Sequence, residues 1–281
     1  MLSYRHAFHA GNHADVLKHA VLVHLLAYLG QKDKPYWYVD THAGASDYAL
    51  DEAWAQKNAE FETGIGRLWS RNDLPPALNA YVERVRLLNA NGTLRSYPGS
   101  SRIAMQMMRE HDRMRLFELH STESRTLQAA YAKDNPRVIV QAGDGFDGLR
   151  SVLPPPSRRG LVLIDPSYED KRDYARARAA LEDSLQRFAT GVYVLWYPLV
   201  QRRESQQFPE SLKRLQKKDW LHVALTVKSP SPDGYGLHGS GLYVLNPPWT
   251  LPAMLRDVMP YLTKVLGQDA GAGLTLESDL S

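Results

Sequence analysis

The amino-acid sequence predicts an α/β protein built on an open, mostly parallel, doubly wound sheet of about seven strands. Short apolar segments rich in β-branched residues alternate with longer stretches whose apolar residues recur at helical spacing. Such alternation is typical of consecutive βαβ units. The predicted strands are Tyr36 to Asp40, Met114 to Leu119, Arg137 to Gln141, Leu161 to Ile164, Gly191 to Trp196, Leu221 to Val227 and Gly241 to Leu245.

A helix is predicted ahead of the first strand, and a helical subdomain after it. Apolar residues recur at helical spacing from Val16 to Tyr28, and Gly30 offers a C-cap. More than seventy residues separate the first two strands, far more than a simple crossover needs. Residues 48–97 are therefore assigned to an inserted helical subdomain.

The rest of the chain is assigned to one Rossmann-like domain and a tail. Residues 1–47 and 98–266 form the domain, and residues 1–12 lead into its first helix. Residues 267–281 are rich in glycine and alanine and end in acidic residues. We expect this tail to be disordered, because it offers little apolar surface to bury.

The amino-acid composition excludes several classes of function. The 281 residues are 43% hydrophobic and 23% charged, as in an ordinary globular protein. The absence of cysteine excludes disulfides, thiolate catalysis and Cys-ligated metal sites, and predicts a cytoplasmic protein. No secretion signal or membrane span is expected, because charged residues and histidines interrupt every apolar stretch. A formal charge of +3 is compatible with a nucleic-acid partner but does not argue for one.

The turn Asp165-Pro166-Ser167-Tyr168 follows the apolar strand Leu161 to Ile164, at a sheet edge where α/β enzymes keep their chemistry. The Asp165 carboxylate and the Pro166 carbonyl could accept both hydrogens of an exocyclic amine and so localise its lone pair, while Tyr168 stacks on the base. The turn resembles the Asp-Pro-Pro-Tyr or Asn-Pro-Pro-Tyr motif of amino-group methyltransferases, which transfer a methyl group from S-adenosylmethionine. An ordinary strand-ending turn explains the tetrapeptide alone equally well.

Three other strand ends carry residues suited to a bound cofactor. Gly44 follows the first strand, where a missing Cβ lets the backbone approach a ligand. Glu118 ends the second strand, at the place where Rossmann-type sites hold a ribose. Asp144, between two glycines, ends the third and could accept from an adenine amine. Each could be a plain turn residue, but four such signals in sequence along one edge favour a cofactor site.

A second motif, Asn246-Pro247-Pro248-Trp249, matches the amino-methyltransferase pattern better by letters. It follows the last predicted strand, so no further parallel strand remains to build a site around it. We interpret its prolines as ending a strand.

Five histidines lie within the first 24 residues: His6, His9, His13, His19 and His24. A zinc site is disfavoured, because no cysteine is present and no acid stands at ligand spacing. A polar helix start with hydrogen-bonded histidines is one alternative. The favoured interpretation is a lead-in segment with Tyr4 and His6 that lies over the cofactor and the target base, with Lys18 and His19 on the helix behind it. Basic and aromatic side chains together suit an unpaired nucleotide.

The motifs together resemble the bacterial 23S ribosomal RNA adenine-N6 methyltransferase J family over nearly the whole chain. The resemblance is carried by the run Leu2 to His19, by Asp40-Thr41-His42-Ala43-Gly44, by Tyr97-Pro98-Gly99-Ser100 and by Asp165 to Glu169. It implies a Rossmann-like methyltransferase sheet and S-adenosylmethionine as cofactor. It implies cofactor contacts at His19, His42, Ser100, Glu118, Asp144, Gly145 and Asp165, catalysis at Asp165, and substrate contacts at Tyr4, His6, Lys18, Pro166 and Tyr168. Ser46 and Ser167 depart from such motifs, which often have Gly and Pro there.

The sequence thus predicts an S-adenosylmethionine-dependent methyltransferase that acts on the N6 amine of one adenine in 23S ribosomal RNA, as a monomer without a metal. Alternatives are a DNA adenine or glutamine methyltransferase, a non-catalytic nucleic-acid-binding protein and a nicotinamide dehydrogenase. The last lacks its three-glycine fingerprint here. The insert is a weaker candidate for RNA contact, through Arg67, Arg71, Arg84, Arg86 and Arg95.

Overall fold

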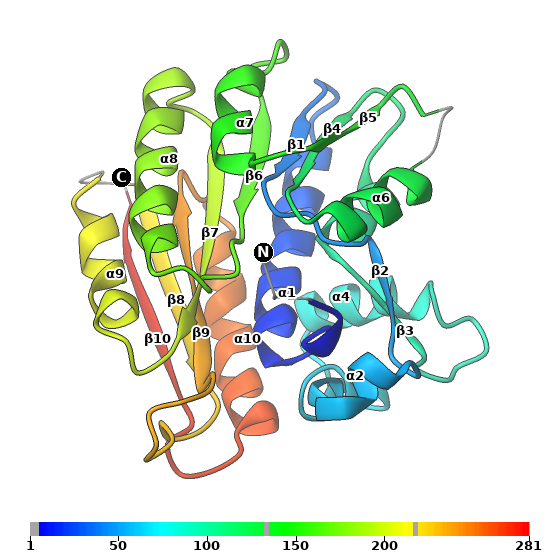
Figure 1. The fold of residues 1–281 in the computed structure, drawn as a ribbon, viewed down its shortest axis with the longest axis vertical. Coiled ribbons are helices and arrows are strands. Elements are labelled where there is room, and N and C mark those ends of the chain that lie inside the picture. Colours follow the sequence, from blue (N-terminus) through cyan, green and yellow to red (C-terminus); the bar gives the residue numbers. More distant parts are fainter. Residues whose placement is uncertain (1–5, 132–134, 216–218, 281) are drawn as a thin grey trace.

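The computed structural model describes residues 6–131, 135–215 and 219–280, which fold around one large sheet (Figure 1). Eight strands pair in the order β10-β8-β9-β7-β6-β1-β4-β5, and β2 pairs with β3 separately. The strands are β1 (Trp37–Asp40), β2 (Asp47–Ala49), β3 (Ser96–Pro98), β4 (Arg113–Glu118), β5 (Val138–Ala142), β6 (Gly160–Ile164), β7 (Val192–Leu199), β8 (Trp220–Thr226), β9 (Gly239–Leu245) and β10 (Gly273–Asp279). The helices are η1 (His6–Phe8), α1 (His13–Gly30), α2 (Ala53–Asn58), η2 (Glu60–Thr63), α3 (Gly66–Trp69), α4 (Pro76–Arg86), α5 (Ser100–Met107), α6 (Ser121–Ala130), α7 (Gly145–Val152), α8 (Arg172–Arg187), α9 (Arg203–Lys213) and α10 (Leu251–Leu266).

The predicted α/β sheet is confirmed, with all seven predicted strands in it. β1 pairs in parallel with β4 and β6, and the β4–β5 and β6–β7 pairs are parallel as well. Parallel strands end at the same edge of a sheet, so the loops after β1, β4, β5, β6 and β7 gather there. β9 runs antiparallel to β7 and β8, and therefore ends at the opposite edge.

The sheet is buried on both faces, as its apolar strands require. All residues of β6 and β9 are buried. One apolar cluster joins α1, α4, α5 and α10 to the sheet, and a second joins α7, α8 and α9. Figure 1 shows α1 and α10 on one side of the central strands and α7 and α8 on the other. None of the helices in the described part of the chain is long and apolar enough to cross a bilayer.

The prediction of a disordered tail is wrong, because residues 273–279 form β10. This strand pairs antiparallel with β8 along its whole length. Leu276 packs against the larger apolar cluster, and Glu277 pairs with Lys213 at 2.8 Å. An edge strand can be mostly polar because only one face meets the core, and the glycine-rich stretch before it supplies the turn.

The inserted segment holds the helices α2, η2, α3 and α4, which cover about half of it. The two-stranded ribbon β2–β3 stands at its ends, with Tyr48 opposite Tyr97. Its buried side chains, among them Leu68 and Tyr81, belong to the same apolar cluster as α1. The insert therefore packs into the common core of the domain.

Candidate active site

A cavity of about 390 Å³ lies at the carboxyl ends of the parallel strands. Residues from α1, the ends of β1, β4, β5, β6 and β7, and the β8–β9 connection line it. The predicted residues that line it are His6, Lys18, His19, His42, Ser100, Glu118, Asp144, Gly145, Asp165 and Pro166. The fold therefore brings all but two of the predicted site residues to one cavity. Of the exceptions, Tyr4 lies outside the described residues, and Tyr168 is buried elsewhere.

Asp40, the last residue of β1, lies behind the cavity wall and holds together residues that line it. Its fully buried carboxylate accepts from the Tyr38 hydroxyl at 2.7 Å, the Ser100 hydroxyl at 2.6 Å and the His42 amide at 3.2 Å. Burial raises the pKa of Asp40, against the effect of these donors. The Ser100 side chain thus fixes the start of α5 to the end of β1. Burial also lowers the pKa of His42 to about 4, so its imidazole is neutral.

Glu118, at the end of β4, holds the loop that follows β1. One carboxylate oxygen accepts from the Gly44 amide at 2.9 Å and the other from the His120 amide at 2.7 Å. Burial raises its pKa despite these bonds. A carboxylate oxygen can accept more than one hydrogen bond, so Glu118 keeps capacity for two neighbouring hydroxyls.

Asp144 and Gly145 join β5 to α7. Asp144 caps α7 by accepting from the Phe146 amide at 3.0 Å, and Arg176 of α8 pairs with it at 2.5 Å. Burial alone would raise the pKa of Asp144, but Arg176 lowers it. A Cβ on Gly145 would lie 2.0 Å from the Thr41 carbonyl oxygen. Glycine is therefore required where the β1 and β5 loops touch.

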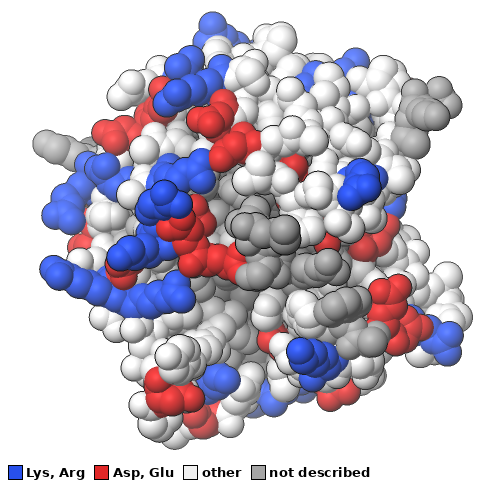
Figure 2. All heavy atoms as spheres, in the orientation of Figure 1, with Lys and Arg blue, Asp and Glu red and all other residues white. Residues whose placement is uncertain are grey.

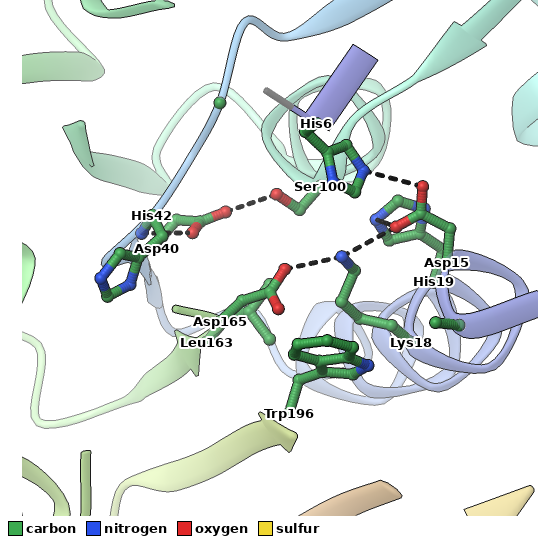
Figure 3. Close-up of polar contacts among 12 residues, drawn as sticks. His6, Asp15, Lys18, His19, Asp40, His42, Ser100, Leu163, Asp165 and Trp196 are labelled. Carbon is green, nitrogen blue, oxygen red and sulfur yellow. Dashed lines mark hydrogen bonds and ion pairs between the residues drawn. The ribbon is translucent and has the colours of Figure 1, made fainter. Parts of the chain in front are cut away.

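Four side chains form a continuous polar chain that ends at Asp165 (Figure 3). His6 Nε2 lies 2.9 Å from Asp15 Oδ2, and Asp15 Oδ1 lies 2.8 Å from Lys18 Nζ. Lys18 Nζ also donates to Asp165 Oδ2 at 2.6 Å. The chain connects the amino-terminal segment, through α1, to the turn after β6.

The charges in this chain follow from burial and pairing. Burial alone would raise the pKa of Asp15, but His6 and Lys18 hold it well below its usual value. Burial would lower the pKa of Lys18, yet Asp15 and Asp165 raise it, so the ammonium stays charged. Burial raises the pKa of Asp165 to about 6, with Lys18 acting in the opposite direction. Asp165 is therefore a carboxylate that can take up a proton near neutral pH.

Tyr168 does not face the cavity, contrary to the prediction that it stacks on a base. It is 3% exposed, its φ is +54°, and its hydroxyl donates to the Trp196 carbonyl at 2.8 Å. This backbone conformation turns the ring toward Tyr174 and Phe208. Trp196 of β7 lines the cavity instead, with Lys18 Nζ 5.9 Å from its ring centre. Its indole N–H is buried and has no hydrogen-bond partner among the described residues.

Lys18 lines the cavity as predicted. Its side chain is only 5% exposed and pairs with two carboxylates. It therefore lies beside Asp165 and not on the outer surface. His6 is likewise tied to the buried Asp15, although it lines the cavity as predicted.

His19 lies on α1 next to the start of α5. Its Nδ1 is 2.8 Å from the Tyr97 hydroxyl, while Nε2 has no hydrogen-bond partner in the described structure. Burial lowers the pKa of His19 to about 3, so it is neutral. This nitrogen lies 4.0 Å from Asp15 Oδ1, beyond hydrogen-bond distance, so it is a suitable contact for a polar ligand.

The histidine-rich terminus forms no metal site in the structure as described, where no three His, Asp or Glu side chains are suitably grouped. Four of these histidines contact acids or a hydroxyl: His6 with Asp15, His9 with Glu60, His19 with Tyr97, and His24 with Thr250. The alternative of hydrogen-bonded histidines at a polar helix start thus describes part of this segment.

The second motif, at Asn246, lies away from the cavity. β9 runs antiparallel to β7, and the Asn246 side chain donates to the carbonyls of Ala189 and Gly191, just before β7 begins. Trp249 is 80% exposed. The interpretation of this motif as a strand-ending turn is confirmed.

Three of the five arginines named in the insert form hydrogen bonds within the protein. Arg67 donates to two carbonyls at the end of α10, Arg71 bonds to Asp73 and Tyr261, and Arg86 bonds to Glu83 and the Trp69 carbonyl.

The sequence did not single out four further residues at or next to the cavity: Asp15, Asp40, Arg176 and Trp196. Of these residues, only Asp15 could have been found from the sequence, through its pairing with Lys18, because residues three apart on a helix are neighbours on its surface.

A doubly wound sheet with a glycine loop, two strand-end acids and an Asp-Pro turn around one cavity is the arrangement that the sequence led us to expect of an S-adenosylmethionine-dependent methyltransferase. The comparisons with known proteins then give the family. The family model described as "Ribosomal RNA large subunit methyltransferase D, RlmJ" matches residues 33–277. The chain belongs to this family, and the predicted cofactor, S-adenosylmethionine, is confirmed with it.

Curated relatives match almost the whole chain. The Ribosomal RNA large subunit methyltransferase J of Escherichia coli is 45% identical over 97% of this chain and 96% of its own length. The Haemophilus influenzae protein of the same name is 43% identical over 99% and 98%. A Legionella pneumophila protein of known crystal structure is 37% identical, with a TM-score of 0.88 over 96% of this chain and 98% of that chain.

Proposed function

We propose that this protein transfers the methyl group of S-adenosylmethionine to the N6 amine of one adenine in 23S ribosomal RNA. The observation that carries the proposal is the position of Asp165: an acid beside a proline carbonyl, at the end of β6 and in the wall of the cavity. The two curated relatives, named as large-subunit ribosomal RNA methyltransferases, support the RNA substrate.

The cofactor fits the part of the cavity between α5, β4 and β5. Glu118 has acceptor capacity for the two ribose hydroxyls, and Asp144 stands where it could accept from the adenine amine. The free amides at the start of α5, together with His19 Nε2, suit the methionine carboxylate. His42 and Phe146, whose ring centres are 4.9 Å apart, add flat apolar surface. The bound cofactor supplies a methyl group activated by a positively charged sulfur.

The target adenine fits the other part of the cavity, beside Asp165, Pro166 and Trp196. Asp165 and the Pro166 carbonyl would accept the two hydrogens of N6 and direct its lone pair away from the ring. Trp196 would offer a flat surface to the base. As the new N–C bond forms, N6 becomes acidic and its proton passes to Asp165, whose pKa of about 6 suits a general base. Lys18 holds the carboxylate in place.

The surface beside the cavity carries charges of both signs. Figure 2 shows Lys and Arg side chains over α8 and α9 with Asp and Glu side chains among them, and several of these arginines pair with acids. The arginines beside a site for one base would contact phosphates of an RNA strand whose target nucleotide is extruded. Tyr4, which lies outside the described residues, stays a predicted RNA contact.

The decisive experiment is mass spectrometry of 23S ribosomal RNA from cells that lack the gene. We expect one N6-methyladenosine to disappear and to return with the wild-type gene but not with the Asp165→Asn variant. Purified protein should methylate RNA from the deletion strain, whereas an adenine-containing DNA duplex should stay unmodified. An unchanged set of modified adenines in the deletion strain would show that the proposed substrate is wrong.

A further inference from the structure

The connection between β8 and β9 places an exposed aromatic side chain at the mouth of the cavity. Gly236 and Leu237 of this connection line the cavity, and Tyr235 just before them is 80% exposed. Gly234 and Gly236 have φ values of +80° and +90°, which favour glycine. Two glycines in this conformation shape the tip on which Tyr235 stands.

The base of the connection is well anchored. The Val227 amide donates to the His238 carbonyl at 2.9 Å, and the His238 amide donates to the Leu199 carbonyl at 3.1 Å. Gln201 Nε2, on the loop after β7, donates to the Ser231 carbonyl at 2.6 Å. These hydrogen bonds therefore fix the base of the connection. Ordering the Tyr235 ring against a flat partner costs little conformational entropy.

This connection flanks the base side of the cavity. Pro198 lines the cavity and pairs in register with Ser240, just after the connection. Trp196, the candidate surface for the target adenine, lies two residues before Pro198 on β7. The cofactor side, around Glu118 and Asp144, is formed by other strands. A strand of RNA whose adenine enters toward Asp165 would therefore pass Tyr235.

We propose that Tyr235 stacks on a nucleotide that neighbours the target adenine in the RNA. This inference rests on the proposed function and names how the same site holds its substrate. Extruding one base exposes the faces of its neighbours, and an aromatic ring at the cavity mouth can cover such a face. Arg202, just before α9, and Arg203, its first residue, are both exposed and would meet the phosphates on either side.

The test compares three variants on protein-free 23S ribosomal RNA from the deletion strain. Tyr235→Ala removes the ring, Tyr235→Phe keeps it, and Trp249→Ala removes an equally exposed aromatic at the opposite sheet edge. We expect Tyr235→Ala to lower kcat/KM by about 5- to 150-fold, the range for loss of one base–aromatic stack. The other two variants should stay within about twofold of wild type. The dissociation constant of S-adenosylmethionine should be unchanged in all three.

A second measurement identifies the stacked partner. Short RNA substrates would carry an abasic site on one or the other side of the target adenine. With the substrate that lacks the stacked base, wild type and Tyr235→Ala should have equal rates, because no base is left for the Tyr235 ring to cover. Equal kcat/KM for Tyr235→Ala and Trp249→Ala, or a Tyr235→Ala defect that persists with both abasic substrates, would overturn the inference. Failure of wild type to methylate any RNA would instead refute the proposed function.

Discussion

Lys18 Nζ lies 2.6 Å from Asp165 Oδ2 and 2.8 Å from Asp15 Oδ1, so one buried ammonium joins two carboxylates. One carboxylate belongs to the same helix, and the other ends a strand 147 residues away in sequence. Because Lys18 and Asp15 are almost fully buried, their charges depend on their partners. The amino-terminal helix therefore helps to position Asp165, and its Lys18 counteracts the rise in the pKa of Asp165 that burial causes.

The Asp165→Asn variant should lose most turnover while it still binds S-adenosylmethionine. The substitution keeps the shape of the side chain but removes the charged acceptor of the N6 hydrogens, which should slow methyl transfer by roughly 10²-fold or more. Single-turnover kinetics on the RNA and calorimetry with the cofactor would measure the two effects. Near wild-type single-turnover rates would mean that another group accepts the amine hydrogens.

The pH dependence of methyl transfer should report the ionisation of Asp165. Burial raises its pKa from the usual value of 3.8 to about 6, and only the carboxylate form can accept a proton. The single-turnover rate should therefore fall about tenfold per pH unit below about pH 6 and level off above it. Lys18 lowers this pKa, so Lys18→Met should shift the decline to higher pH. Lys171→Met, at an exposed lysine, is the control, and an equal profile for both variants would contradict the assignment.

Glu118→Ala should weaken S-adenosylmethionine binding by about 1.5 to 3 kcal/mol, the range for hydrogen bonds to a charged group. Calorimetry measures the loss. The Gly44 and His120 amides also lose their acceptor, so the melting temperature must be compared in parallel. Glu118→Gln retains one acceptor oxygen and should fall between wild type and the alanine variant. An unchanged dissociation constant would return Glu118 to a purely structural role in the loop.

The sequence was sufficient for the fold wherever strands are apolar and buried. β6 is a continuous apolar run and β9 ends in one, Leu242 to Leu245, and such runs predict strands without any knowledge of their neighbours. β10 could not be predicted this way, because its stability comes from pairing with β8, about fifty residues earlier in the chain. A local pattern carries no information about such a partner.

The site was predictable where topology alone fixes it. Parallel strands end at one edge, so Glu118, Asp144 and Asp165 had to converge once the sheet was recognised. The orientation of individual side chains was not predictable. Tyr168 turns inward because its backbone adopts a left-handed conformation, and Lys18 is buried because α1 packs on nearly all sides. Both features depend on tertiary packing.

Trp196 lines the cavity where Tyr168 was expected to, so the RNA methylation rates of variants at the two positions can be compared directly. Trp196→Leu should lower the RNA methylation rate by about tenfold or more, because base stacking on an aromatic ring is worth about 1 to 3 kcal/mol. Tyr168→Phe loses only the hydroxyl bond to the Trp196 carbonyl and should keep at least half of the activity. Both rates are compared under saturating cofactor. The reverse ranking would show that Tyr168 meets the base.

Deletion of residues 273–281 should destabilise the protein and leave methyl transfer by the folded enzyme nearly intact. The deletion exposes the edge of β8, removes Leu276 from the core, and breaks the contacts of Glu277 with Lys213 and His222. A loss of about 2 kcal/mol would lower the melting temperature by roughly 4 to 8 °C in a domain of this size.

The activity of the folded deletion variant should change little at low temperature, because β10 is the edge strand of the sheet and lies several strands from β6 and β1. Glu277→Ala, which keeps the strand, is the control and should cost less. An unchanged melting temperature for the deletion would show that β10 adds no stability to the sheet.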